Sequence, residues 1–269
     1  MDAAKPETTP RRFARYVALG DSTTEGLDDP DDEGGYRGWA NRLAERIASH
    51  QGSLAYANLA VRGKCTREIK YEQLDPALAL APDLATVVAG MNDLLRGRFD
   101  ARAIASDLGD MQRALVERGC TVVSFTIPDI SRRLALPPLD RVLASRTHAL
   151  DHEIRRVSAA SGAILLDLAT YPLASDPRVW SRDRLHANPD GHARIAGAVA
   201  QALGLPGADD SWLAPLPAPP RVGFAARLAE HAAWSRDYLA PWLWRRLAGR
   251  SAAPGAAKRP RLSPIIPAT

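Results

Sequence analysis

Two short segments place a serine and a histidine in settings that suit a nucleophile and its base. Ser22 ends a Gly-Asp-Ser triplet that directly follows the apolar run 16–19. His186 comes three residues after Asp183, close enough in one turn for the carboxylate to accept a hydrogen bond from the ring. A serine hydroxyl needs a base to remove its proton, and an imidazole beside a carboxylate is such a base. The sequence therefore predicts a hydrolase with Ser22 as nucleophile, His186 as general base and Asp183 as the acid that orients the histidine.

Acyl transfer also needs hydrogen-bond donors for the negative charge of the tetrahedral intermediate. Gly63 follows the apolar run 54–59 and can present its backbone N–H without a side chain in the way. Asn92 follows the run 84–89 and can offer a side-chain amide, and the N–H of Ser22 is a third candidate. Taken alone, Gly63 is also typical of a turn and Asn92 of a helix cap or Asx turn. Their order along the chain, each just beyond a strand, favours an oxyanion hole.

The elements that must position these residues alternate between strands and helices. Apolar runs typical of strands occupy residues 16–19, 54–59, 84–89, 121–127 and 163–168. Helical segments are expected at about 39–49, 101–118, 140–161 and 189–203. This alternation predicts a parallel sheet with helices on both faces, in which sites lie beyond the carboxyl ends of the strands.

These residues carry a resemblance to a known family. The Gly-Asp-Ser triplet ending at Ser22, Gly63, the segment 90–93 and Asp183-x-x-His186 look like the sequence blocks of the GDSL-type esterases and lipases, or SGNH hydrolases, a family that includes lysophospholipase-like bacterial esterases. The likeness spans about residues 13–203. It implies a flavodoxin-like three-layer α/β/α sandwich with a five-stranded, mainly parallel sheet, and hydrolysis of esters or thioesters without a cofactor or metal.

The resemblance also implies the role of each site residue. Ser22, His186 and Asp183 correspond to the nucleophile, the general base and the orienting acid, and Ser22 N–H, Gly63 N–H and Asn92 to the oxyanion donors. The expected reaction is cleavage of a carboxylic ester of a small molecule or a lipid through an acyl-serine intermediate. A thioesterase, a lysophospholipase and a carbohydrate O-deacetylase remain alternatives with the same residues. A non-catalytic binding module that uses the C-terminal tail is an alternative from a different class.

Charge is distributed unevenly along the chain. The formal net charge is +4, yet the segment after Asp237 has no acidic residue and six basic ones, so the remainder carries about −2. The basic residues of this segment are Arg245, Arg246, Arg250, Lys258, Arg259 and Arg261. The high isoelectric point thus describes the tail, and nothing in the body of the chain favours nucleic acid as a partner.

Changes in composition divide the chain into five parts. We expect a flexible N-terminus at 1–12, the hydrolase domain at 13–205, a proline-rich linker at 206–221, a helical extension at 222–250 and a basic, disordered tail at 251–269. Trp234, Tyr238, Trp242 and Trp244 cluster in the extension. A helical hairpin that packs back on the domain is one interpretation. A basic amphipathic element that makes peripheral contact with an anionic membrane is the other.

The sequence also indicates where in the cell the protein is located. The sequence has no apolar stretch long enough for a membrane span and no signal-like N-terminus, which favours a cytoplasmic protein.

We expect Asp21 and Glu25 to order the turn around Ser22, and His192 to be structural. The acidic residues within 28–33 lack the spacing of a calcium loop and predict a solvated loop at the mouth of the site.

Overall fold

The computed structural model describes residues 11–32, 34–131, 139–218, 223–241, 244 and 255–267. The predicted flexible N-terminus therefore lies, up to residue 10, outside the described part of the chain. The same holds for residues 245–254 of the extension and tail.

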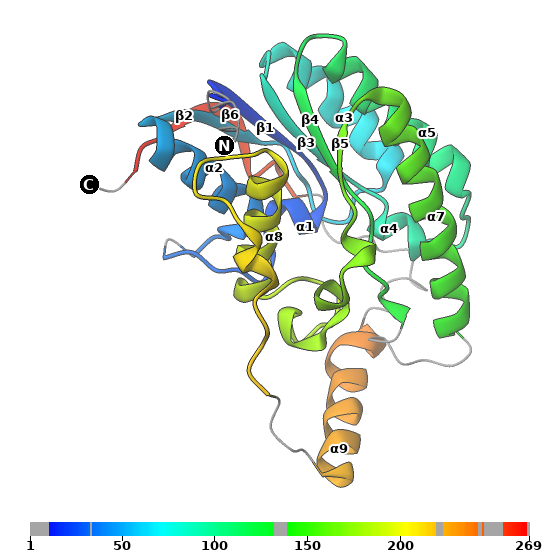
Figure 1. Cartoon of the computed structure of the whole chain (residues 1–269). Coiled ribbons are helices and arrows are strands. Elements are labelled where there is room, and N and C mark those ends of the chain that lie inside the picture. Colours follow the sequence, from blue (N-terminus) through cyan, green and yellow to red (C-terminus); the bar gives the residue numbers. More distant parts are fainter. Residues whose placement is uncertain are drawn as a thin grey trace, which may run out of the picture.

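A six-stranded sheet forms the centre of the molecule (Figure 1). Its strands are β1 (Arg15–Gly20), β2 (Leu54–Asn58), β3 (Leu84–Val88), β4 (Thr121–Phe125), β5 (Ile164–Leu166) and β6 (Arg259–Ile265). The strand order is β5-β4-β3-β1-β2-β6, and β1 to β5 are parallel. This order places the five parallel strands in the sequence 2-1-3-4-5 of a flavodoxin-like doubly wound sheet. The predicted α/β class and all five predicted strands are confirmed.

The sixth strand corrects two expectations: that the sheet has five strands, and that residues 251–269 are disordered throughout. β6 lies antiparallel to β2, with Leu54 opposite Ile265 and Ala55 opposite Pro264 (Figure 1). The prolines and basic residues that suggest disorder in the sequence are also what natural proteins place on an edge strand, where one side needs no partner. β6 thus covers the edge that β2 would otherwise expose.

Helices cover both faces of the sheet (Figure 1). α2 (Gly38–Gln51) and α8 (Pro189–Ala202) pack on one face, while α3 (Thr66–Ala79), α5 (Ala101–Val116) and α7 (Leu139–Ser161) pack on the other. The four predicted helices are confirmed, with ends that differ by at most two residues. α3 is absent from the predictions because its buried face is not an apolar stripe: it contains Gln73, which exchanges two hydrogen bonds with the backbone of Gly20.

Two short helices begin directly after β1 and β3. α1 (Ser22–Glu25) and α4 (Met91–Leu94) both lie at the carboxyl edge of the sheet. β1 and β3 are neighbours, and the chain leaves β1 for β2 on one side and later returns to β3 on the other. This reversal of strand order opens a crevice between the two strand ends, where doubly wound sheets bind their ligands.

The remaining described elements follow β5 and α8. Three 3₁₀ turns, η1 (Leu168–Thr170), η2 (Pro172–Ser175) and η3 (Pro177–Val179), lead to the turn with His186, and η4 (Asp210–Leu213) lies in the predicted linker. α9 (Phe224–Trp234) continues into a π-helical turn, η5 (Ser235–Leu239), and stands out from the body of the molecule (Figure 1). No helix in the described ranges is long and apolar enough to cross a membrane.

Candidate active site

Ser22, His186 and Asp183 form a continuous chain of polar contacts. Ser22 Oγ lies 2.8 Å from His186 Nε2, and Nδ1 of the same ring lies 2.5 Å from Asp183 Oδ2. With its proton on Nδ1, the imidazole donates to the carboxylate and accepts from the serine hydroxyl. The structure thus brings Ser22 to the Asp183–His186 pair, although 164 positions separate Ser22 from His186 in the sequence.

The local fold around Ser22 presents its hydroxyl at the edge of the sheet. Asp21 caps α1 by accepting a hydrogen bond from the Thr23 N–H, and Gly26 ends the helix at a φ of 97°. Glu25 accepts hydrogen bonds from the backbone N–H and the guanidinium of Arg62. The expectation that Asp21 and Glu25 order this turn agrees with these contacts.

A tight turn fixes His186 beside Asp183. One carboxylate oxygen of Asp183 accepts hydrogen bonds from the backbone N–H groups of Leu185 and His186, at 2.9 and 3.0 Å, while the other oxygen contacts the ring. Arg184 adopts a φ of 64°, a left-handed conformation that is uncommon for a residue with a side chain. Both the backbone and the ring of His186 are therefore held by the same carboxylate.

The surroundings adjust the pKa values of the two partners in opposite directions. Burial by itself would lower the pKa of His186, but the hydrogen bond and the charge of Asp183 outweigh it and raise that pKa above its ordinary value. Burial would raise the pKa of Asp183, but its hydrogen bonds with His186 hold that pKa below its ordinary value. The site thus favours an ionised Asp183 beside an imidazole of increased basicity.

Asn92 links the segments that contain Ser22 and Gly63. Its side-chain amide donates to Asp21 at 2.9 Å and to the backbone oxygen of Lys64 at 3.0 Å, so it contacts a direct neighbour of each residue. Gly63 has a φ of 80°, and the space that a side chain would occupy there is open. Both N–H groups of the Asn92 amide therefore donate to protein acceptors in this structure, which the sequence could not reveal.

Asp21 is buried between these groups. Burial raises its pKa to about 6, although its hydrogen bonds with Thr23 and the charge of His186 act in the opposite direction. Its acceptor oxygens are used by the Thr23 N–H and by Asn92. Asp21 therefore orders both the start of α1 and the amide of Asn92.

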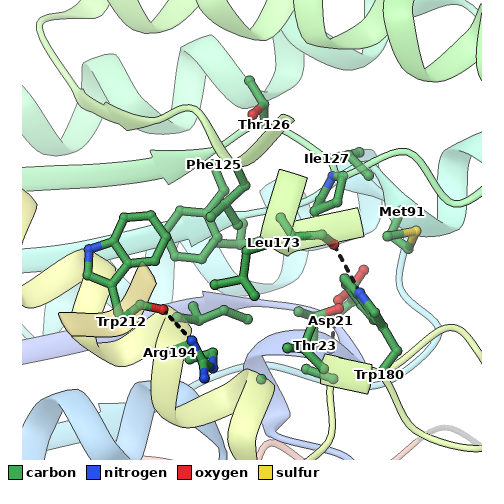
Figure 2. Close-up of a pocket in the computed structure, with 18 of the residues that line it drawn as sticks. Asp21, Thr23, Met91, Phe125, Thr126, Ile127, Leu173, Trp180, Arg194 and Trp212 are labelled. Carbon is green, nitrogen blue, oxygen red and sulfur yellow. Dashed lines mark hydrogen bonds between the residues drawn. The ribbon is translucent and has the colours of Figure 1, made fainter. Parts of the chain in front are cut away.

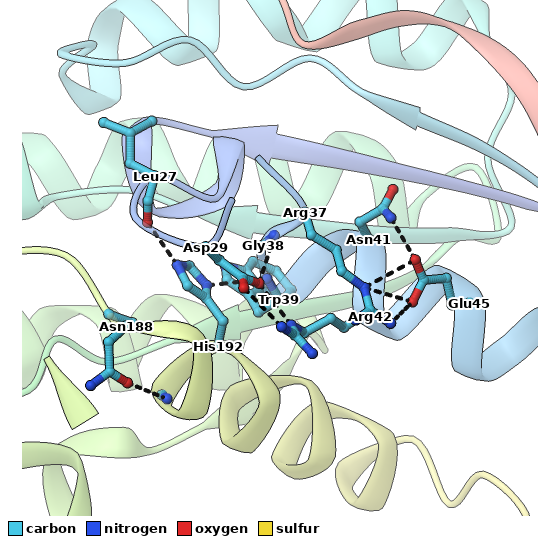
Figure 3. A network of polar contacts seen from close by, with 12 residues as sticks. Leu27, Asp29, Arg37, Gly38, Trp39, Asn41, Arg42, Glu45, Asn188 and His192 are labelled. Carbon is cyan, nitrogen blue, oxygen red and sulfur yellow. Dashed lines mark hydrogen bonds and ion pairs between the residues drawn. The ribbon is translucent and has the colours of Figure 1, made fainter. Parts of the chain in front are cut away.

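A buried network fixes the loop between α1 and α2 (Figure 3). Asp29 accepts hydrogen bonds from the Gly38 N–H and from Arg42, at 2.7 to 3.0 Å, and is only 1% exposed. This corrects the expectation that the acidic residues of 28–33 are solvated throughout. Asp29 is buried because the ion pair with Arg42 compensates for its desolvation.

His192 joins the same loop to α8 (Figure 3). Its Nδ1 accepts a hydrogen bond from the Trp39 N–H at 3.1 Å, and its Nε2 lies 2.9 Å from the Leu27 oxygen. Burial lowers the pKa of His192 to about 4, so the ring is neutral and can accept at one nitrogen while it donates at the other. These contacts agree with the structural role expected for His192.

An apolar cavity opens beside the polar site (Figure 2). The empty space between its lining residues is about 820 Å³, a figure that includes the part open to solvent. Asp21, Thr23 and Trp180 lie toward one end of the view and Phe125 and Trp212 toward the other. Since Asp21 and Thr23 flank Ser22, the cavity begins next to the serine. Its walls come from strands, helices and loops that are far apart in the sequence, which is why the sequence did not reveal it.

A cluster that could hold a metal ion overlaps the contacts already described. Ligand atoms of Asp28, Asp183 and His186 lie within 4.8 Å of one another. Asp183 and His186 already satisfy each other through their hydrogen bond, and Asp28 is exposed. We assign no metal to these three residues, because the hydrogen bond between Asp183 and His186 already explains why this acid lies beside this histidine.

The fold and the contacts between serine, histidine and aspartate define a hydrolase of the doubly wound α/β class. Residues 18–194 match the GDSL-like Lipase/Acylhydrolase family, so the chain belongs to that family. It is a hydrolase that acts on ester bonds. The search of curated proteins gave no match.

Several solved structures share this fold. TesA is 21% identical with a TM-score of 0.57, covering 70% of this chain and 97% of its own. The esterase EstA from Pseudoalteromonas sp. is 16% identical with a TM-score of 0.56, covering 71% and 96%. Axe2, an acetylxylan esterase from Geobacillus stearothermophilus, is 14% identical with a TM-score of 0.57, covering 71% and 94%. The likeness confirms the fold class predicted from the sequence.

Proposed function

We propose that the enzyme cleaves carboxylic esters through an acyl-serine intermediate formed on Ser22. The observation that carries this proposal is the chain of contacts from Ser22 Oγ through the imidazole of His186 to the carboxylate of Asp183. His186 takes the hydroxyl proton as Ser22 attacks the acyl carbon, and it gives the proton to the departing alcohol. Water activated by the same ring then hydrolyses the acyl-enzyme and regenerates the serine.

This role of His186 predicts a specific dependence of activity on pH. Only the neutral ring can accept the serine proton, so kcat/KM should rise with pH through the pKa of His186. Because Asp183 raises that pKa, the midpoint of the rise should lie above the ordinary value of 6.5. Asp28→Asn removes a nearby negative charge that also raises the pKa, and it should move the midpoint to lower pH. A midpoint below 6.5 in the wild type would contradict the assignment.

We propose that the Ser22 N–H, the Gly63 N–H and the Asn92 amide bind the oxyanion. The open space at Gly63 and the bonds that link Asn92 to Asp21 and Lys64 support this proposal. Asn92 must exchange one of its present acceptors for the oxyanion as the tetrahedral intermediate forms. Asp21 is the acceptor that directly adjoins Ser22, so we infer that this bond is the one exchanged.

Loss of the Asn92 amide should slow the chemical step more than it weakens substrate binding. Asn92→Ala should lower kcat by about 10²–10³ with a small change in KM, because the donor acts mainly on the charge of the transition state. Steady-state kinetics on one ester at a fixed pH measures both parameters. An Asn92→Ala variant whose kcat stays within twofold of the wild type would remove this residue from the oxyanion hole.

The apolar cavity supports an acyl group longer than acetyl as the substrate. Its walls include Met91, Ile127, Leu168 and Leu173, and the wall nearest the serine contains Thr23. Each methylene group that enters such a pocket gains about 0.8 kcal/mol of transfer free energy. An acetyl group, the acyl group named for the similar Axe2, would leave most of this surface unused.

Acyl chain length is therefore the experiment that tests this substrate proposal. With p-nitrophenyl esters, kcat/KM for hexanoate should exceed that for acetate by about tenfold or more, because burial of only two of its four additional methylenes gains ~1.6 kcal/mol and a factor of ten corresponds to about 1.4 kcal/mol. Ala174→Phe should fill part of the cavity and remove this preference while acetate is still cleaved. Ala193→Phe, exposed on α8, is the matched control. A wild type that prefers acetate would overturn the proposal.

Two expectations from the sequence stay predictions. A thioester, a lysophospholipid and an acetylated carbohydrate would use the same three residues, and activity on each compared with a simple ester separates these substrates.

Peripheral membrane contact of the extension is favoured by the exposure of Phe224 and Leu228, four residues apart on α9. Arg259 and Arg261, by contrast, lie in β6, so part of the basic tail belongs to the sheet.

A further inference from the structure

The C-terminal extension contacts the turn that contains Asp183 and His186. Trp234, the last residue of α9, is 6% exposed, whereas the other described side chains of α9 and η5 are exposed or half-buried. The indole N–H of Trp234 donates a hydrogen bond to the backbone oxygen of Asp183, at 3.2 Å. A buried tryptophan at the end of an otherwise exposed helix indicates a specific attachment point.

The same tryptophan also contacts the next residue of the turn. The guanidinium of Arg184 lies over the Trp234 ring, 4.5 Å from its centre, and Arg184 Nη1 lies 3.1 Å from His231 Nδ1. A cation over an indole face is a favourable contact that gains strength when water is excluded. The extension therefore contacts both Asp183 and Arg184.

The conformation of Arg184 determines the geometry of the neighbouring acid. Its φ of 64° turns the chain so that Asp183 can accept from the N–H groups of Leu185 and His186 and from the ring. A left-handed conformation is costly for a residue with a side chain and persists where the surroundings hold it in place. Trp234 and His231 supply such surroundings from a part of the chain beyond residue 194, where the family match ends.

We propose that Trp234 is a positioning residue of the active site, which holds the turn 183–186 so that Asp183 and His186 keep their mutual geometry. This inference rests on the proposed roles of Asp183 and His186. The extension is then part of the catalytic apparatus rather than an appended module. Trp234 acts through the turn and is not itself a catalytic residue.

The charged groups near His186 influence the pKa that a titration of its ring measures. Asp183 lies in the same turn, Asp21 follows β1 and Asp28 follows α1, and all three raise the pKa of His186. Burial and, to a smaller extent, the charge of His186 lower the pKa of His192 on α8. None of these groups lies on α9, whose titratable His231 contacts Arg184 rather than the His186 ring. We therefore expect a change in this titration caused by a substitution at Trp234 to be transmitted through the turn.

The test compares full-length Trp234→Ala and Trp234→Phe with Tyr238→Ala, an aromatic control at a 39% exposed position of η5 in the same helical segment. Trp234→Ala should lower kcat for a short ester by ~10- to 100-fold with little change in KM, as expected for a small displacement of catalytic groups. Trp234→Phe keeps a ring beneath Arg184 and should recover part of the loss. Tyr238→Ala should behave as the wild type.

A titration of the His186 ring by NMR supplies a readout that does not depend on turnover. Loosening the turn should lower the midpoint of this titration in Trp234→Ala, since the hydrogen bond with Asp183 raises it. If Trp234→Ala does not fold, the smaller shift of the same sign expected for Trp234→Phe decides the matter. Unchanged kcat and an unchanged midpoint in the variants would overturn the inference. A wild type without esterase activity whose midpoint still falls in Trp234→Ala would refute the proposed function and leave the positioning intact.

Discussion

A Ser22→Ala variant loses ester hydrolysis by a factor of ~10⁴ or more in kcat, because no acyl-enzyme can form without the hydroxyl. The substitution removes one oxygen from a position that is 8% exposed and leaves α1 with its cap at Asp21. Substrate binding should therefore change little. Initial rates with p-nitrophenyl butyrate at equal concentrations of folded protein measure the loss.

The control for this variant is Ser145→Ala, an exposed serine on α7. It should retain the activity of the wild type. If Ser22→Ala kept activity within tenfold of the wild type, another group would have to be the nucleophile, and the proposed mechanism would be wrong.

His186→Ala should reduce kcat by a similar factor, ~10⁴ or more, since nucleophile and base act as one unit. The ring is the group 2.8 Å from Ser22 Oγ, and it is also the group through which Asp183 affects the serine. Without it, the hydroxyl keeps its proton at neutral pH and the departing alcohol receives none. The double variant Ser22→Ala/His186→Ala should be scarcely slower than either single variant.

An exposed histidine on α7 provides the matched control for the base. His148→Ala should leave kcat and its pH dependence unchanged. If the losses in the double variant multiplied, Ser22 and His186 would act independently, which would contradict a shared proton transfer.

The residues around Ser22 and His186 could be predicted because their signals are local in the sequence. An apolar strand, a Gly-Asp-Ser triplet and an acid three residues before a histidine each occupy a few adjacent positions. The alternation of strands and helices then requires Ser22, Gly63 and Asn92 to follow strands that end at one edge of the sheet. The structure places all three segments at that edge.

Features that depend on distant contacts could not be predicted in this way. β6 has prolines and basic residues, and only its pairing with β2 distinguishes it from a disordered tail. Asp29 resembles its acidic neighbours in sequence, but the ion pair with Arg42 makes it a buried structural residue. The bonds of Gln73 to Gly20 likewise explain a helix whose apolar pattern is weak.

The contact between Trp234 and the turn 183–186 illustrates the same limit. The sequence shows aromatic residues in the extension and predicts a helix, which α9 confirms over 224–234. It does not indicate that one of them, Trp234, donates a hydrogen bond to Asp183, some fifty residues away. The expected helical hairpin spans residues 222–250, of which 223–241 and 244 are described and the last six lie outside the described part of the chain. Within that part, α9 and η5 form one continuous helical segment.

Covalent trapping tests the central claim most directly. The protein is incubated with a fluorophosphonate, digested, and the modified peptide is sequenced by mass spectrometry. We expect one phosphonyl group on Ser22 and a loss of activity that is proportional to the labelled fraction. We also expect much slower labelling of His186→Ala, because its serine lacks its base. A protein that hydrolyses esters but carries the label on another residue, or carries none, would contradict the account.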